Sequence, residues 1–111
     1  MAPSLNPARG EVEFRAAGQS FRLAATAASV AALEARVGAL GLRDLLARLN
    51  AVNLATIRAG LICLDAAPAE EAERKVDKLG LPDLVAAANE LAQALLFGLK
   101  RGNGTATAPT P

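Results

Sequence analysis

Apolar and polar residues alternate in two short runs near the N-terminus, on either side of an interval that contains glycine. Val12 and Phe14 are the apolar positions of the first run, and Phe21 and Leu23 are those of the second. A period of two predicts a β-strand, and two such runs joined by a short interval predict a β-hairpin. We expect all four side chains to share one face and to pack on the rest of the protein, because an isolated hairpin is marginal in water.

The pairing register of this hairpin also follows from the pattern. A two-residue Ala17-Gly18 loop places Phe14 opposite Phe21 and Glu13 opposite Arg22, so that apolar side chains pair on one face and opposite charges on the other. A slip of one residue would destroy both kinds of pair at once. The first loop residue must adopt a positive φ, so a three-residue loop with a bulge is the alternative.

Beyond residue 25 the apolar spacing changes to three and four residues, which predicts about five short helices. The first helix follows Thr26, a good N-cap, and stops at Gly38. An asparagine-containing break at residues 50–53 separates the second helix from the third. Pro68 and Pro82 open the last two helices, as proline does at a first helical turn.

The third helix, residues 54–64, has a bulky face and a small face. The bulky face consists of Leu54, Ile57, Leu61 and Leu64, and the small face of Thr56, Ala59, Gly60 and Cys63. Small side chains let another helix approach closely. This pattern therefore places the third helix between neighbours.

The last helix is expected to run to about Leu99 and to bury one apolar stripe. The stripe consists of Leu84, Val85, Ala88, Leu91, Ala92, Leu95, Leu96 and Leu99. Phe97 projects to nearly the opposite side. Either the hairpin, the tail or a bend at Gly98 covers Phe97, or it joins Leu96 and Leu99 in an exposed patch that binds a partner helix or a second copy of the chain.

The fold class predicted from these elements is α+β, mostly helical, with an N-terminal hairpin packed on a bundle of about five short helices. The composition agrees, because 52% of the residues are hydrophobic but only 3% are aromatic, which favours closely packed Ala/Leu helices. We expect a flexible N-terminus at residues 1–8, a single domain at residues 9–100 and a disordered tail at residues 101–111.

The chemistry available to the chain is sparse. It has no His, Tyr or Trp, so we expect no enzyme activity, no cofactor and no metal site. Cys63 lacks a histidine partner and is interpreted as a structural thiol rather than a nucleophile. Glu70 and Glu71 lie four residues before Arg74 and Lys75, a spacing typical of surface ion pairs rather than of a carboxylate site.

The charge balance argues against electrostatic partners. Twelve basic and eleven acidic residues give a net charge of +1, with the signs interspersed, so neither nucleic acid nor an anionic membrane is an expected partner. Residues 42–61 form two short helices about a joint and superficially suggest a helix-turn-helix DNA reader. The second helix of that pair carries only Arg58 as a cation, which disfavours this interpretation.

Three segments carry a resemblance to a known family. They are Asn6-Pro7-Ala8-Arg9-Gly10-Glu11, the hairpin end Phe21-Arg22-Leu23, and Ala32-Leu33-Glu34 in the first helix. With the order of the later helices, they resemble the gene-transfer-agent branch of the phage tail assembly chaperones, small proteins encoded beside the tail tube gene. The resemblance covers about residues 6 to 99.

This resemblance implies a protein that binds the long tape-measure protein and recruits tail tube subunits in the bacterial cytoplasm. Self-association through the patch at Leu96, Phe97 and Leu99 is a further expectation, which comes from the helix pattern and not from the resemblance. Two alternatives stay open at this point. The chain could be a minor tail or connector protein that remains in the particle, or a small DNA-binding regulator.

Overall fold

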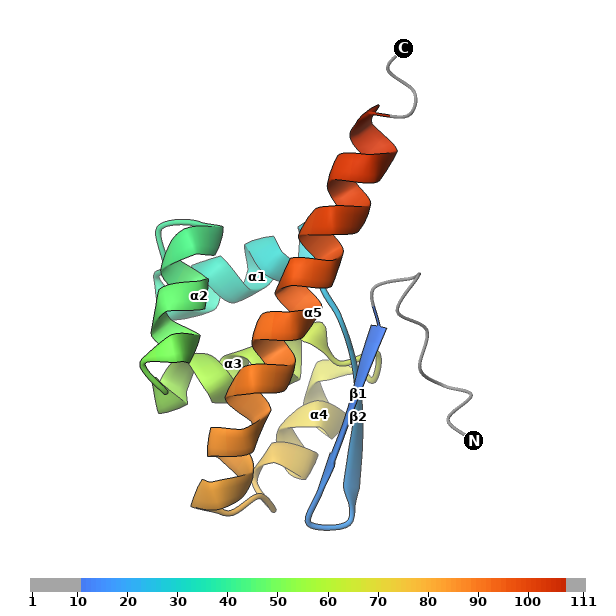
Figure 1. Ribbon diagram of the computed structural model, residues 1–111. Helices are drawn as coiled ribbons and strands as arrows, with labels where there is room; N and C mark the ends of the chain where they lie inside the picture. The colour runs from blue at the N-terminus through green and yellow to red at the C-terminus, as the bar shows by residue number, and fades with distance from the viewer. Residues whose placement is uncertain (1–10, 108–111) are drawn as a thin grey trace.

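The computed structural model describes residues 11–107 (Figure 1). It shows an antiparallel hairpin followed by five helices and is 66% helical, which confirms the predicted α+β, mostly helical fold. The elements in chain order are β1 (Glu11–Ala16), β2 (Gln19–Ala24), α1 (Ala27–Val37), α2 (Leu42–Asn50), α3 (Leu54–Leu64), α4 (Ala69–Val76) and α5 (Leu81–Thr107).

The hairpin has the predicted register. Phe14 lies opposite Phe21, and Glu13 lies opposite Arg22. The turn is the two-residue Ala17-Gly18 loop, with φ values of 52° and 75°, so the bulged alternative is not adopted. Two positive φ angles match the right-handed twist of the strands, and this match accounts for an alanine in a conformation that usually takes glycine or asparagine.

The helix boundaries follow local capping interactions. The Thr26 hydroxyl accepts a hydrogen bond from the backbone N–H of Ser29, and the Ser29 side chain accepts one from the backbone N–H of Thr26. Gly38 ends α1 in the left-handed conformation, with φ 69°. The Asn53 side chain accepts a hydrogen bond from the backbone N–H of Thr56 at the start of α3. These contacts confirm the predicted start and end of α1 and the predicted break before α3.

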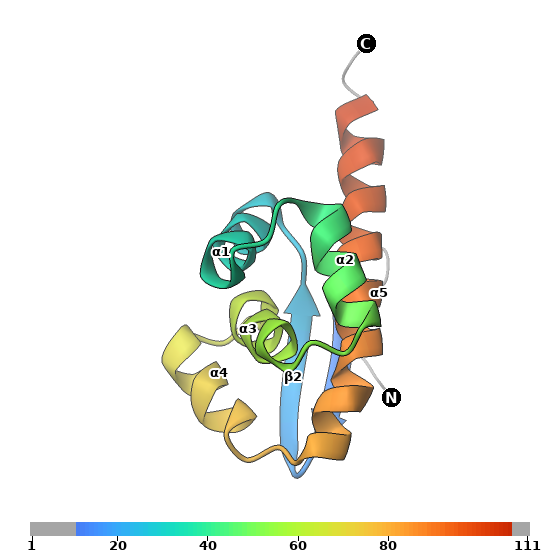
Figure 2. The ribbon, with the colours of Figure 1, turned by 90° about the vertical axis from the view of Figure 1, so that its left-hand side faces the viewer.

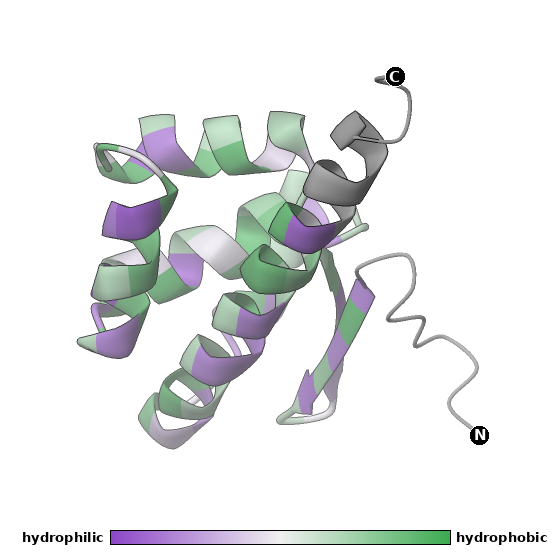
Figure 3. Cartoon of the chain, turned by 45° about the horizontal axis from the view of Figure 1, so that its top comes forward, coloured by the Kyte–Doolittle hydropathy of each residue, from purple (hydrophilic) through white to green (hydrophobic). Residues whose placement is uncertain are grey.

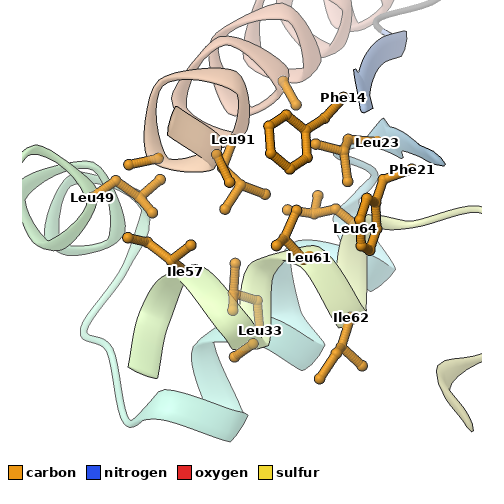
Figure 4. Close-up of a cluster of buried hydrophobic side chains, with 14 of the residues drawn as sticks. Phe14, Phe21, Leu23, Leu33, Leu49, Ile57, Leu61, Ile62, Leu64 and Leu91 are labelled. Carbon is orange, nitrogen blue, oxygen red and sulfur yellow. The ribbon is translucent and has the colours of Figure 1, made fainter. Parts of the chain in front are cut away.

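Helix α3 lies at the centre of the molecule, as its two-faced pattern predicts. It packs against α1, α4, α5 and β2 (Figure 2). Its bulky residues Ile57, Leu61 and Leu64 meet Leu91 of α5 and the phenylalanines of the hairpin in one core (Figure 4). The four apolar side chains of the hairpin are buried in the same core, which confirms that the ribbon packs on the helices.

A buried ion pair fastens the hairpin to α4. Lys75 Nζ lies 2.6 Å from a carboxylate oxygen of Asp65, and the two side chains are only 15% and 2% exposed. The same Nζ donates to the carbonyl of Ser20 at 2.7 Å and lies 4.6 Å from the centroid of the Phe21 ring. The backbone N–H of Arg22 donates to the other oxygen of Asp65 at 3.0 Å. The predicted surface pairing of Lys75 on its own helix is therefore wrong, because its ammonium turns inward to a desolvated carboxylate.

Helix α5 differs from its prediction in length and in the direction of its buried face. It extends to Thr107 instead of ending near Leu99, since the first proline after Lys100 is Pro109. Its buried residues are Leu84, Ala87, Ala88, Leu91, Ala94 and Leu95. Val85, which the predicted stripe would bury, is exposed because the core lies to one side of that stripe, and Leu96 and Leu99 are exposed as the alternative of a patch predicts. The flexible segment predicted at residues 1–8 and the end of the predicted tail, residues 108–111, lie outside the described residues.

Candidate functional site

A shallow apolar groove runs between α2 and α5. Its volume is about 460 Å³. We call it the α2–α5 groove, and it is lined by Leu46, Leu49, Asn50, Val85, Ala88, Asn89, Ala92 and Leu96. Val85 is 47% exposed and Leu96 is 49% exposed, so both leave half of their surface in water. Hydrophobic and hydrophilic residues alternate along the turns of α5 in the hydropathy-coloured view (Figure 3).

A second hollow continues this apolar surface toward the end of α5. It has a volume of about 260 Å³ and is lined by Ala25, Thr26, Ala27, Val30, Leu42, Leu95, Gly98 and Leu99. Leu99 is 45% exposed. Val85, Ala92 and Leu99 are spaced by seven residues, so they lie on nearly the same side of the helix. The two hollows share no lining residue, but both lie between α2 and α5, because Leu46 of α2 lines the first and Leu42 lines the second.

The three residues proposed as a patch from the sequence are not all on this surface. Leu96 lines the α2–α5 groove and Leu99 lines the second hollow. Phe97 is partly buried against the core. It lies about 200° around the helix axis from Leu99, which shares the second hollow with Leu42 of α2, so Phe97 is on the side of α5 away from α2. Phe97 thus belongs with the covered residues, and the exposed surface consists of Leu96, Leu99 and residues that the sequence assigned to the core.

The groove is lined without a charged side chain, and helical spacing places two exposed cations beside its lining residues. Arg43 lies seven residues before Asn50 on α2, and Lys100 lies four residues after Leu96 on α5; both are exposed. The acidic residues of α5 within the described side chains, Asp83 and Glu90, lie far around the helix from this face.

The carboxylate of α2 is also turned away from the groove. Asp44 accepts hydrogen bonds from the backbone N–H of Leu40 at 2.9 Å and from Arg48 Nε at 3.3 Å. These two contacts, the backbone bond first, lower the pKa of Asp44. Asp44 therefore stays ionised at neutral pH and is committed to the connection between α1 and α2.

A larger hollow, of about 560 Å³, lies on another face and has three arginines in its lining. Two of them already have partners. Arg48 donates to the backbone carbonyls of Val37 and Gly38 at the end of α1, and Arg58 pairs with Asp77 at 3.0 Å. Glu73 also lines this hollow. Its cations are therefore largely balanced, and we regard the smaller apolar surface as the better candidate site.

Cys63 is half-buried and packs against the core. Burial raises the pKa of its thiol, and nearby Arg36 opposes this shift only in part. A thiol whose pKa lies above the ordinary value is protonated at neutral pH and is a poor nucleophile. This environment agrees with the interpretation of Cys63 as a structural residue.

Helix α3 has no long exposed face that could enter a DNA groove. Seven of its eleven residues are buried, and Arg58, its one cation, is paired with Asp77. A recognition helix needs several side chains free to reach base edges. The position of α3 therefore disfavours the helix-turn-helix interpretation.

The described residues contain no cluster of three or more metal-ligating side chains. No helix in this part of the chain combines the length and apolarity that a membrane span requires. Comparisons with protein-family models, with curated proteins and with solved structures found no match.

Proposed function

We propose that this chain is a tail assembly chaperone of the gene-transfer-agent type. It binds the tape-measure protein and recruits tail tube subunits through protein–protein contacts in the bacterial cytoplasm. The chaperone leaves when the tube is complete. It acts by binding, without catalytic chemistry.

The observation that supports this proposal best is the half-exposed apolar surface along α2 and α5. Amphipathic helices bind other proteins by laying an apolar face into such a groove, with anchors every three or four residues. A chaperone must also release its client. A shallow surface that includes the amide side chains of Asn50 and Asn89 suits reversible contact better than a deep apolar pocket does.

The second support is the resemblance described above. The order of a hairpin followed by five helices agrees with the layout that the resemblance implies. Neighbouring genes offer an independent check, since a tail tube gene upstream and a very long tape-measure gene downstream are expected for this class.

Co-expression tests the proposal directly. The chain, carrying an affinity tag, is expressed with the tape-measure protein and the tail tube protein of the same gene cluster. We expect both to co-purify with the chain and the tape-measure protein to be more soluble in its presence. Purified particles are then examined by mass spectrometry, where a chaperone is absent. Presence of the chain in stoichiometric amount would instead favour a structural tail component, and failure to retain either protein would contradict the proposal.

A further inference from the structure

We propose that the occupant of the α2–α5 groove is an amphipathic helix of the client whose apolar positions are flanked by acidic residues. This inference rests on the proposed function, because it names the part of the client that the chaperone holds. Recognition of the client is assigned to this groove and to the two cations beside it, Arg43 and Lys100.

The dimensions of the surface suit a helix. From Val85 to Leu99 the apolar residues of α5 span about 21 Å, which corresponds to about four helical turns. Leu46 of α2 lines the opposite wall from Val85 and Leu96. A helix laid between two helices packs its side chains into the hollows between theirs. Leucine-like residues that recur at positions i, i+4, i+7, i+11 and i+14 of the client span the same four turns and would reach both hollows.

The charges select an acidic client. Arg43 marks the rim on α2 and Lys100 marks the rim on α5, while Asp44, Asp83 and Glu90 lie on other sides of these two helices. Exposed ammonium and guanidinium groups attract carboxylates that flank the apolar anchors of a bound helix and repel cations there. Complementary charge at a rim governs selectivity and the rate of association more than affinity.

The same charges disfavour a second copy of this chain. No carboxylate of α2 or of the described part of α5 faces the groove, so in a pair formed through this surface neither copy offers a counter-charge to the Arg43 and Lys100 side chains of the other. A helix that carries carboxylates beside its apolar anchors does offer one.

Two synthetic peptides provide the probe. Both are fluorescein-labelled, about 18 residues long and helical, with leucine at the anchor positions; one carries glutamate at the flanking positions and the other lysine. Binding to the full-length protein is measured by fluorescence anisotropy at low and high salt. We expect the glutamate peptide to bind at least about tenfold more tightly at low salt, with the preference shrinking as salt screens exposed charges. Equal affinity for the two peptides would overturn the assignment of an acidic client.

Variants locate the site. Leu96→Asp places a charge in the groove and should weaken binding of the glutamate peptide at least about tenfold. Leu40→Asp is the matched control, because Leu40 is 92% exposed and does not line the groove. The double variant Arg43→Glu, Lys100→Glu should prefer the lysine peptide. Circular dichroism establishes that each variant is folded. Loss of binding in the Leu40 control, or an unchanged preference in the double variant, would contradict the proposed site.

Light scattering and co-expression separate this inference from the proposed function. Concentration-dependent dimers that Leu96→Asp abolishes would overturn the acidic client in favour of a second copy. Retention of the tape-measure protein by both the wild type and Leu96→Asp would overturn the groove as the site and leave the chaperone function standing. Binding of the glutamate peptide as expected, with no retention of the tape-measure protein, would support the groove and contradict the function.

Discussion

Apolar side chains are buried on one side of α5 and half-exposed on the other. On the hairpin side, Phe21 and Leu23 are fully buried, and the Asp65–Lys75 ion pair, which is withdrawn from water, holds β2 to α4. On the α2 side, Val85 and Leu96 leave about half of their surface exposed. Both sides belong to one helix with one continuous apolar pattern.

The difference arises from the direction of the core face of α5 and from the elements that cover each side. The hairpin is fastened at β2 to Asp65 and Lys75 and lies along α5 (Figure 1). Helix α2 has only nine residues, about 13 Å, against the 27 residues of α5. Burying a leucine or valine fully stabilises a protein by about 1.5–3 kcal/mol, so each half-exposed side chain leaves part of that stabilisation available to a partner. The covered side thus holds the fold together, and the uncovered side is the proposed binding surface.

Truncation of one residue on each side gives the strongest test of this contrast. Phe14→Ala removes a buried ring from the hairpin core and should lower the free energy of unfolding by about 3–5 kcal/mol. Leu96→Ala should lower it by less than about 1 kcal/mol, since half of that side chain is already in water. Urea denaturation of the two variants measures both values. Equal losses would mean that the two sides are not different.

The ion pair provides the next largest effect. Lys75→Met leaves the carboxylate of Asp65 buried without its cation and should cost about 3 kcal/mol. Adding Asp65→Asn removes the uncompensated charge and should restore part of the loss. Thermal unfolding of the single and double variants checks this order. If Lys75→Met is as stable as the wild type, the pair is not desolvated and does not fasten the hairpin.

Substitutions at Gly98 of α5 and at Gly60 of α3 test how closely α5 packs against its neighbours. A Cβ at Gly98 would meet the backbone oxygen of Ala25 and lie 2.8 Å from its Cβ, so Gly98→Ala should cost about 1–3 kcal/mol despite better helix propensity. A Cβ at Gly60 would lie 3.1 Å from both terminal carbons of Leu91, which can move. Gly60→Ala should therefore be nearly neutral, and Gly60→Leu clearly destabilising. Denaturation curves rank the three variants, and tolerance of Gly98→Ala would show that α5 is not held tightly there.

The smallest effect is expected at the hairpin turn. Ala17 holds a φ of 52°, a conformation that costs an ordinary residue roughly 1 kcal/mol and that asparagine tolerates better. Ala17→Asn should raise the free energy of unfolding by up to about 1 kcal/mol, and Ala17→Val should lower it. The melting temperatures of the two variants should move in opposite directions. A shift in the same direction would exclude turn strain as the cause.

Several features could be read directly from neighbouring residues. The period of two and the Ala17-Gly18 loop determined the hairpin register, and Thr26 and Gly38 determined the ends of α1. The interactions responsible, cross-strand pairs and caps, join residues close together in the chain. Local spacing therefore specifies them without knowledge of the rest of the fold.

The candidate site was only partly predictable. The sequence indicated Leu96 and Leu99 but grouped them with Phe97, which packs against the core, and it assigned Val85 to the core. The width of the apolar stripe was the one sign of an exposed face, because a short neighbouring helix cannot cover a stripe that wide. Spacing shows which residues share a side of a helix, but not which part of that side its neighbours reach.

The sequence by itself therefore determined the elements, their order and the pairing of the strands. Only the tertiary structure decided the direction of the α5 core face and the partner of Lys75, which lies 55 positions from the carbonyl it binds. It also divided the small face of α3, where Gly60 meets Leu91 of α5 while Cys63 lies near Arg36 of α1. These outcomes depend on crossing angles and relative lengths of helices, which are set by packing of the whole core and not by the spacing within one segment.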